Sequence, residues 1–353
     1  MTASTARITQ RMIADIAGVS QSTVSLVLNG KADETRRIPA ATRDRVLEVI
    51  RETTYVANPV ARSLAGATNG LIGVFTYEPA FPNRSSDFYT PLLTGIESAA
   101  EGVGADLLVF TSTPVVDGHR RLFHESNRLR LADGCILLGR EMDPDELERL
   151  LDTAYPFVAI GRRDAAGGRV PYVGVDYVSA TRSLADMAVG LGHTRFGLLR
   201  LPLTAESSRD RREGLVAGLT GHGDLAEAEM TTGTTVTDAW DAIRPSRPTV
   251  LFIEDPVDAQ LLHEHLSASG IRVPEDLSIV VLGEHNRPRE RAVDHTRLSA
   301  PRTELGARAV AALTARLEAL HTTDTDSAAD ADPVQELLPC TIVAGATLAA
   351  PPG

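Results

Sequence analysis

Short polar side chains at the start of one predicted helix have the chemistry needed to read DNA bases. Gln21 and Ser22 open a run whose apolar residues, Val24, Val27 and Leu28, repeat at helical spacing on the opposite side. A glutamine amide can pair bidentately with adenine, and hydroxyl groups bind base edges or phosphates. The run therefore predicts a helix that presents hydrogen-bonding side chains to a partner, with the major groove of DNA as one candidate.

A preceding helix is expected to hold this one in place. Ile13, Ala14, Ile16 and Ala17 form one apolar face, and Gly18 can end the helix in the left-handed conformation. The two helices would then pack through these apolar faces, with a tight turn between them.

A third helix is expected to cover the first two. Pro39 fits its first turn, and its inward stripe would be Val46, Leu47, Val49 and Ile50.

Capping residues support the same arrangement. Thr9 can cap the first helix, Val19 can fill the angle between the helices, and Ser20 is a suitable N-cap for the second helix. This is the layout of a helix-turn-helix, whose second helix enters the major groove. An ordinary helical hairpin has the same pattern, so the layout alone leaves both interpretations open.

Five motifs in the first 65 residues carry a resemblance to a known family. They are Ala17–Ser20, Thr23–Ser25 with Asn29, Arg43–Val46, Tyr55–Pro59 and Ala61–Ala65. In this order they resemble the LacI/GalR family of bacterial transcription regulators. The resemblance implies a non-catalytic, ligand-responsive repressor that binds a palindromic operator as a homodimer. It also implies that a small-molecule effector, most often a sugar, controls this binding.

The resemblance also implies a fold and a set of DNA contacts. The expected fold is an all-α helix-turn-helix DNA-binding head with a hinge helix, joined to an α/β two-lobed domain like the type I periplasmic binding proteins. The expected DNA-binding residues are Thr9, Ser20, Gln21, Ser22, Thr23, Ser25, Leu26, Asn29, Asn58, Arg62 and Leu64.

The charge of the chain is divided unevenly along its length. The net charge is -12, but residues 1–66 hold nine Lys or Arg and six Asp or Glu, and the rest of the chain is strongly acidic. A basic head on an acidic body favours phosphate contact by the head alone. Lys31, Arg36 and Arg37 lie in a polar loop after the second helix, where they could bind phosphates or simply be solvated.

A short capped segment follows the head. Asn58 is a suitable N-cap, Pro59 suits the first turn, and Gly66 can end the helix. A helix of about two turns is marginal by itself, so it needs a second copy or DNA as a partner; otherwise the segment is a plain linker. In the resembled family this is the hinge helix, and Leu64 holds the position whose leucine enters the minor groove. The expected domains are 1–57 (head), 58–66 (hinge helix) and 67–353 (effector binding and dimerisation).

From residue 71 onward, short apolar runs alternate with helical patterns. The predicted strands are Leu71–Phe75, Asp106–Phe110, Gly134–Leu138, Phe157–Ile160, Tyr172–Val175, Phe196–Leu199, Val250–Ile253, Ser278–Leu282 and Thr341–Val343. The predicted helices are Leu92–Val103, Pro144–Thr153, Ala180–Gly190, Arg209–Leu219, Val257–Ser269 and Arg302–Leu320. This alternation predicts parallel sheets with helices on both faces, and the length favours two similar lobes.

Ligands of such folds bind beyond the carboxyl ends of the strands, so residues just after the strands are the effector candidates. The family's aromatic pair against the effector matches Phe88 and Tyr89 here, although these rings could instead pack the next helix. The family's ligand-binding arginine matches Arg211, which could clamp a carboxylate or sugar hydroxyls or could form a surface ion pair. The candidates are Asp87, Phe88, Tyr89, Arg162, Asp176, Arg211, Glu254 and Glu284.

Two of these positions depart from the family pattern. The family commonly has Asn-Asp where this chain has Glu254-Asp255, and it commonly has an acid where this chain has Gly283, with Glu284 one position on. These departures argue against transferring a relative's ligand to this chain.

An enzyme on a doubly wound sheet and a solute-binding transport protein are the alternative functions. Thr76–Pro79 lacks the glycine-rich phosphate-binding pattern, and the sequence has neither a Gly-x-Ser-x-Gly elbow nor a Cys/His cluster. We therefore expect no catalytic, metal or cofactor site. The DNA-binding head and the polar N-terminal residues oppose a transport role and favour a cytoplasmic location, and no apolar run is long enough to span a membrane.

The remaining singular residues have structural interpretations. Cys135 and Cys340 are expected to be buried free thiols in strand-like contexts, His193 a turn residue, and Trp240 part of a core. The acidic stretch His321–Pro333 is expected to be a mobile loop, because it lacks the spacing and final glutamate of an EF-hand calcium site. No leucine heptad follows the last predicted strand, which favours a dimer over a tetramer.

Overall fold

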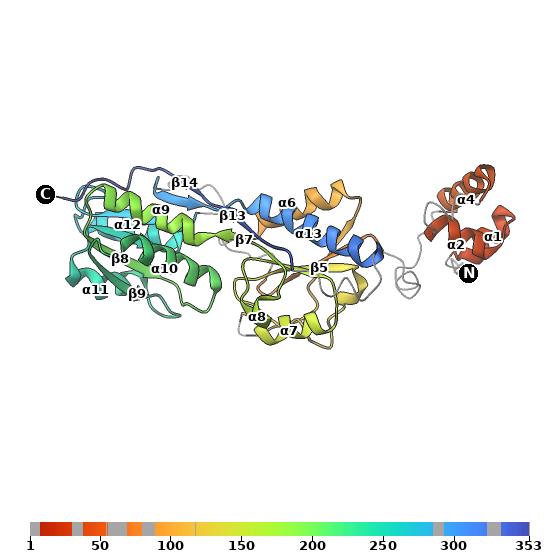
Figure 1. Cartoon of the computed structure of the whole chain (residues 1–353), viewed down its shortest axis with the longest axis horizontal. Coiled ribbons are helices and arrows are strands. Elements are labelled where there is room, and N and C mark those ends of the chain that lie inside the picture. The colour runs from red at the N-terminus through yellow and green to blue at the C-terminus, as the bar shows by residue number, and fades with distance from the viewer. Residues whose placement is uncertain are drawn as a thin grey trace, which may run out of the picture. The chain divides into compact units, whose positions relative to one another are not determined.

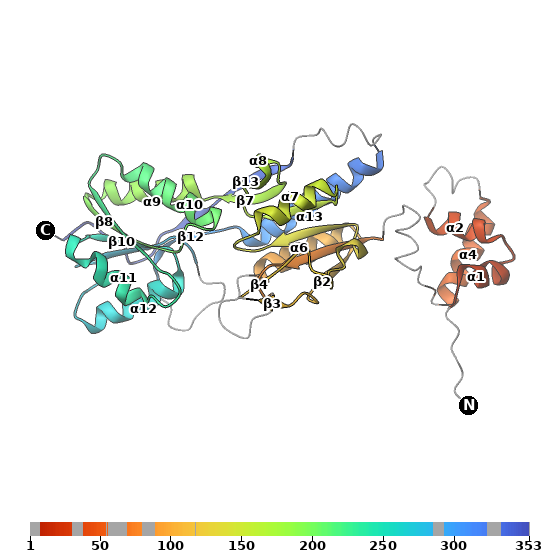
Figure 2. The same cartoon turned by 90° about the horizontal axis from the view of Figure 1, so that it is seen from below.

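The computed structural model describes residues 8–29, 38–53, 55, 69–79, 89–116, 118–284, 293–322 and 333–352. Contacts between residues divide the chain into two compact units, Met1–Gly70 and Leu71–Gly353. The first unit is helical. The second contains two lobes, each with a six-stranded sheet covered by helices on both faces (Figures 1 and 2).

The head contains α1 (Gln10–Ala17), α2 (Gln21–Asn29) and α4 (Ala40–Thr53). Its buried core is Ile13, Ala14, Ala17, Val24, Val46 and Val49. The Thr9 hydroxyl accepts a hydrogen bond from the amide of Met12 at 3.3 Å, and Gly18 ends α1 with a φ of 65°. The predicted cap and the predicted left-handed stop are therefore both confirmed.

Two residues assigned to the apolar faces of the head are not buried. Ile16 is 58% exposed and Leu47 is 39% exposed. A cluster of three short helices covers only a narrow stripe on each of them, and in α1 that stripe is centred on Ile13, Ala14 and Ala17. Ile16 and Leu47 lie at the edges of their stripes, so the prediction that they face inward was wrong.

Lobe 1 is built on a parallel sheet in the order β13-β7-β6-β5-β1-β2. Its strands are β1 (Leu71–Thr76), β2 (Asp106–Phe110), β5 (Gly134–Leu138), β6 (Phe157–Ile160), β7 (Tyr172–Asp176) and β13 (Gln335–Pro339). Helices α6 (Thr90–Gly102) and α13 (Arg302–Thr322) pack against one face, and α7 (Pro144–Asp152) with the short α8 (Ala165–Gly168) lies against the other (Figure 1). A hairpin of β3 (Val115–Val116) and β4 (His119–Arg120) and the turn η1 (Leu129–Leu131) lie between β2 and β5.

Lobe 2 repeats this plan with the order β14-β12-β11-β10-β8-β9. Its strands are β8 (Arg195–Arg200), β9 (Asp224–Glu229), β10 (Val250–Ile253), β11 (Ser278–Val281), β12 (Thr296–Ser299) and the antiparallel β14 (Thr341–Val343). Helices α9 (Tyr177–Gly190) and α10 (Glu206–Leu219) cover one face, and α11 (Val236–Ile243), the turn η2 (Arg244–Ser246) and α12 (Pro256–Ala268) lie on the other side (Figure 2). The chain passes between the lobes after β7, after β12 and after β13.

Several single-residue expectations are confirmed by this fold. Cys135 and Cys340 are both free thiols, but only Cys135 is buried, since Cys340 is partly exposed between the end of β13 and the start of β14. His193 is buried in the turn after α9 and bridges the Thr249 hydroxyl and the carbonyl of Ala349, each at 2.8 Å. Trp240 is 5% exposed and belongs to a core cluster of lobe 2.

The acidic stretch was expected to begin at His321, but α13 continues to Thr322, so its first two residues are helical. Residues 323–332 of that stretch lie outside the described residues.

Glycines allow the paired helices of each lobe to pack closely. A Cβ atom on Gly95 of α6 would lie 1.9 Å from the carbonyl oxygen of Thr303, and one on Gly306 of α13 would lie 2.2 Å from that of Leu92. The helix pair of lobe 2 packs equally closely. A Cβ on Gly214 of α10 would lie 2.1 Å from the carbonyl oxygen of Val178 in α9. Backbone atoms cannot move aside as a side chain can, so these positions require glycine.

We expect Gly95→Ala to destabilise the protein by about 1–3 kcal/mol, because overpacking forces α6 and α13 apart. Gly102→Ala, also in α6, is the matched control, since its added Cβ would meet nothing within 4 Å. Removing a helical glycine there should be neutral or stabilising by about 0.5–1 kcal/mol. Urea unfolding of the full chain measures both changes. Equal midpoints for the two variants would contradict this account of the helix pair.

Candidate functional site

The start of α2 is organised by hydroxyl groups. Ser20 accepts a hydrogen bond from the amide of Thr23 at 3.1 Å and so caps the helix, as predicted. Its hydroxyl also lies 2.7 Å from that of Ser22 and 2.8 Å from that of Thr23. These contacts fix the first turn of the helix and leave Gln21 exposed beside it.

The side chains on the outer face of α2 match the expected recognition surface in part. Gln21, Ser22 and Leu26 are exposed, while Thr23 and Ser25 are half-buried. The inner face packs Val24 into the core of the head. The exposed set therefore offers one amide, one hydroxyl and one apolar contact.

The other expected DNA contacts are less fully described. Thr9 uses its hydroxyl to cap α1, and Asn29 is the last residue of α2. Asn58, Arg62 and Leu64, together with Lys31, Arg36 and Arg37, lie outside the described residues. Their roles stay predictions.

In lobe 2, Arg211 lies at the carboxyl end of the sheet and is held within its own lobe. It donates to the carbonyl of Leu282 at 2.9 Å and to that of Ser207 at 3.0 Å. Its guanidinium carbon lies 3.6 Å from the centre of the Tyr177 ring, a cation–π contact. The guanidinium is thus positioned before any ligand binds, and the ion pair that it forms is a largely buried one with Glu254, not a surface pair.

Glu254 follows β10 and is only 6% exposed. Its carboxylate accepts hydrogen bonds from the amide of Leu201 at 2.9 Å and the hydroxyl of Ser208 at 2.5 Å, and it lies 3.7 Å from Arg211. A buried carboxylate needs such partners. Through its hydrogen bond with Ser208, Glu254 links the end of β10 to the start of α10, and its negative charge stabilises the guanidinium of Arg211.

Asp176 and Glu284 lie near the same edge. Asp176 caps α9 by accepting from the amide of Ser179 at 2.9 Å, and Glu284 lies 3.5 Å from Arg302 of lobe 1. Burial raises the pKa of Cys340 to about 11, and the charges of Arg211, Arg302, Glu284 and Asp176 also act on this thiol. The four charged side chains therefore gather around the crossover that follows β13.

In lobe 1, Tyr89 packs against the sheet and also reaches its carboxyl edge. It is 5% exposed, belongs to the core under α6, and donates a hydrogen bond to the carboxylate of Glu78, which follows β1. The same carboxylate accepts from the amide of Arg140 at 3.1 Å. Burial, with a smaller effect from Glu78, raises the pKa of Tyr89 well above its usual value. Asp87 and Phe88 lie outside the described residues.

Arg162, which follows β6, has its guanidinium paired with a carboxylate of the other lobe. It binds Asp210 of α10 in the other lobe, with nitrogen–oxygen distances of 2.6 and 2.9 Å. Asp210, Glu78 and Tyr177 were not among the sequence-derived candidates. The weak signal for Asp210 was the helical i, i+4 spacing of Glu206 and Asp210 directly before Arg211.

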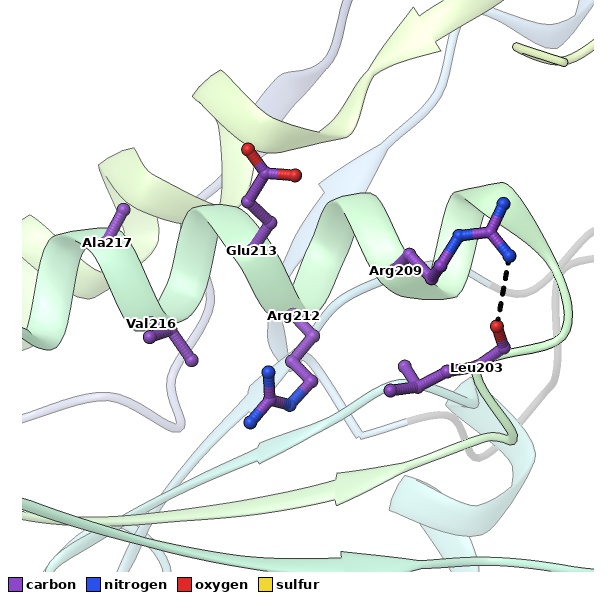
Figure 3. Close-up of a pocket in the computed structure, with 6 residues that line it drawn as sticks. All are labelled: Leu203, Arg209, Arg212, Glu213, Val216 and Ala217. Atoms are coloured by element: carbon purple, nitrogen blue, oxygen red, sulfur yellow. Dashed lines mark hydrogen bonds between the residues drawn. The ribbon is translucent and has the colours of Figure 1, made fainter. Parts of the chain in front are cut away.

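Two surface hollows lie near these residues. One, of about 450 Å³, is lined by Pro91, Glu284, Ala300, Pro301, Arg302, Thr303 and Glu304, and so combines a strand end of lobe 2 with the starts of α6 and α13. The other, of about 460 Å³, lies beside α10 and is lined by Leu203, Arg209, Arg212, Glu213, Val216 and Ala217 (Figure 3). Only the first contains an effector candidate.

Other classes of site are not found in the part of the chain that the structure describes. Within those residues no group of three or more His, Cys, Asp or Glu side chains could hold a metal ion. No described helix is long and apolar enough to cross a membrane.

Comparison with known families decides the class of protein. Residues 11–58 match the family described as "Bacterial regulatory proteins, lacI family". Residues 80–253 match "Periplasmic binding proteins and sugar binding domain of LacI family", and residues 185–348 match a periplasmic binding protein-like domain. The chain belongs to the LacI family. It is a ligand-responsive transcription regulator and not an enzyme, because this family is a non-enzymatic one.

Individual relatives match 76% of this chain. The HTH-type transcriptional regulator AglR of Rhizobium meliloti (strain 1021) is 27% identical over 278 residues, which is 76% of this chain and 76% of AglR. Catabolite control protein A of Staphylococcus aureus (strain Mu50 / ATCC 700699) is 26% identical over 275 residues, 76% of this chain and 80% of that protein.

Solved structures share the fold. The lac repressor dimer bound to operator and the anti-inducer ONPF has a TM-score of 0.70 at 22% identity, covering 98% of this chain and 100% of that one. A complex of the transcriptional regulator CelR with cellobiose has a TM-score of 0.64 at 23% identity, covering 97% and 100%. The predicted combination of a helical head with two α/β lobes is therefore confirmed.

Proposed function

We propose that this LacI-family regulator represses transcription by binding a palindromic operator as a homodimer, and that a small carbohydrate in the cleft between its lobes controls this binding. The observation that carries the proposal is the exposed face of α2, with Gln21, Ser22 and Leu26, on a chain that also holds a two-lobed effector domain. The solved complexes of the lac repressor with its operator and of CelR with cellobiose support DNA and a carbohydrate as the two ligands.

The proposal divides the chain into a head (1–57), a hinge helix (58–66) and an effector-binding and dimerisation domain (67–353). Asn58, Arg62 and Leu64 would act on DNA from the hinge helix, and Arg211, Tyr89 and Glu284 would line the effector cleft. The cytoplasm, where operator DNA is found, is the compartment this function needs.

Selection of DNA from a randomised pool by the full chain tests the operator proposal. We expect the enriched sequences to be inverted repeats, because two heads in a symmetric dimer read two half-sites. Enrichment of a single, non-repeated site, or no enrichment, would contradict the homodimeric operator complex.

The same selection tests the role of Gln21. Gln21→Ala should relax specificity at one base pair in each half-site and cost about 1–3 kcal/mol there, because a bidentate amide contact is lost. Glu52→Ala, at an exposed position in α4, is the control and should leave the selected sequence unchanged. If the Gln21 variant selects the wild-type sequence with equal stringency, Gln21 does not read a base.

A further inference from the structure

A set of ion pairs joins the two lobes. Three consecutive residues that follow β6 in lobe 1 contact residues in the first turns of α10 in lobe 2. The latch residues, as we call them, are Arg162, Arg163 and Asp164 of lobe 1 and Glu206, Arg209 and Asp210 of lobe 2.

The central pair is bidentate and nearly enclosed. Arg162 donates through Nε and Nη2 to the two carboxylate oxygens of Asp210, at 2.9 and 2.6 Å. The side chain of Asp210 is 5% exposed. Hydrogen bonds to Asp210 raise the pKa of Arg162 above its usual value. Bidentate arginine–carboxylate pairs of this kind are among the stronger side-chain contacts in proteins.

The second pair lies deeper in lobe 1. Arg163 is 4% exposed and donates to Glu206 at 3.1 Å and to the carbonyls of Gly139 at 2.6 Å and Ile160 at 3.1 Å. The third pair, Arg209 with Asp164 at 3.0 Å, is half-exposed. Arg209 is also tied to the carbonyl of Leu203 at 3.2 Å, which fixes it at the start of α10 (Figure 3).

The charges of the latch residues balance, since three arginines face three carboxylates. A buried carboxylate or guanidinium is tolerated only when it is paired, and removing one partner leaves an uncompensated charge. In the closed arrangement Asp210 has Arg162 as this partner, and the partner comes from the other lobe. Separation of the lobes would instead return both groups to water.

The latch crosses the edge at which ligands of this fold bind. Arg162 follows a strand of lobe 1, and α10 follows a strand of lobe 2, both at the carboxyl ends of their sheets. We propose that the latch residues hold the two lobes closed in the absence of effector, so that the ion pairs across the cleft, and not the ligand alone, set the resting conformation.

Helix α10 connects the latch to the effector candidates. Asp210 binds lobe 1, and the next residue, Arg211, donates to the carbonyl of Leu282 in lobe 2. A ligand that changes the position of Arg211 therefore acts on the same helical turn as the latch. This link to regulation rests on the proposed function, whereas closure of the lobes does not.

Distance measurement between spin labels tests the latch without DNA or effector. Cysteines replace Glu148 in α7 and Asp241 in α11, which are 56% and 60% exposed, on a full chain carrying Cys340→Ala. Cys135 is fully buried and stays unlabelled. We expect a single, narrow distribution of interlobe distances in the parent protein. Arg162→Gln and Asp210→Asn should each convert it to a longer, broader distribution.

The matched control is a bidentate pair within one lobe. Arg272 binds Asp276 at 2.9 and 2.7 Å, both in lobe 2, so Asp276→Asn should leave the interlobe distance unchanged. The double variant of Arg162 and Asp210 should open the lobes no further than the single variants, because both remove the same contact.

An unchanged distance in both Arg162→Gln and Asp210→Asn would overturn the latch, as would equal opening by Asp276→Asn. The two test variants change different lobes, so loss of folding in one still leaves the other as the test. Operator binding is measured separately, so its failure would count against the proposed function and not against the latch.

Discussion

Replacing Arg211 with alanine should abolish the effect of the effector on operator binding while preserving operator binding itself. Arg211 is held by the carbonyls of Leu282 and Ser207 and by the ring of Tyr177, with Glu254 3.7 Å away. Its guanidinium is therefore positioned before ligand arrives, and such preorganisation lowers the cost of binding. Without this guanidinium, the proposed ligand loses its charged hydrogen-bond donor.

Arg212→Ala is the matched control for this prediction. Arg212 is the neighbouring residue, but it binds Glu227 of β9 with two contacts of 2.7 Å (Figure 3 shows Arg212). Operator affinity with and without ligand is measured by fluorescence anisotropy. Arg211→Lys should restore little, because an ammonium group cannot reproduce a planar fork and its ring contact. A full ligand response in Arg211→Ala would assign this arginine a structural role.

Leu64→Ala should lower specific operator affinity substantially and reduce the bend in the bound DNA. In the proposed hinge helix, each copy of Leu64 enters the minor groove at the operator centre, and apolar wedges of this kind unstack a base step. Bending has an elastic cost that added contacts offset, and pyrimidine–purine steps bend most easily. The preferred operator should therefore have a flexible central step, for which the family resemblance suggests C-G.

Nonspecific binding gives the internal control for Leu64→Ala. It depends on the basic residues of the head and should barely change, and its salt dependence should be retained. Leu47→Ala, another exposed leucine of the head, should leave the bend intact. Gel-shift bending assays compare the three proteins. An equal bend and equal affinity in Leu64→Ala and wild type would mean that residues 58–66 are a linker.

Strands that consist of an apolar run could be predicted from the sequence, including the edge strands β2 and β14, whereas the more polar strands β9, β12 and β13 could not. The runs at β5, β6 and β10 are fully buried and wholly apolar, so their composition alone predicts buried strands. The edge strands β9 and β13 are half-exposed and include glutamates, as in Asp224–Glu229, so their composition resembles a loop. In the same way, Ile16 and Leu47 have core-like residue types but lie at the edges of small helices.

The strand-end rule pointed to Arg162 and Glu254, which follow β6 and β10, and the family resemblance pointed to Arg211, but neither indicated the partners of these side chains. Their contact with an effector stays a prediction. The pairing of Arg162 with Asp210 joins residues 48 positions apart and depends on how the lobes close, which no local pattern encodes. A side chain's position after a strand is therefore predictable, whereas the charge that neutralises it is not.

One titration tests the central claim that the lobes control a DNA-binding head. The full chain is titrated onto its selected operator, with and without a saturating carbohydrate identified by thermal-shift screening of sugars. We expect two chains per duplex and an operator affinity that changes about tenfold or more when ligand is bound, within the usual range of allosteric coupling. Identical affinity with and without a ligand that demonstrably binds the lobes, or one chain per duplex, would contradict the account.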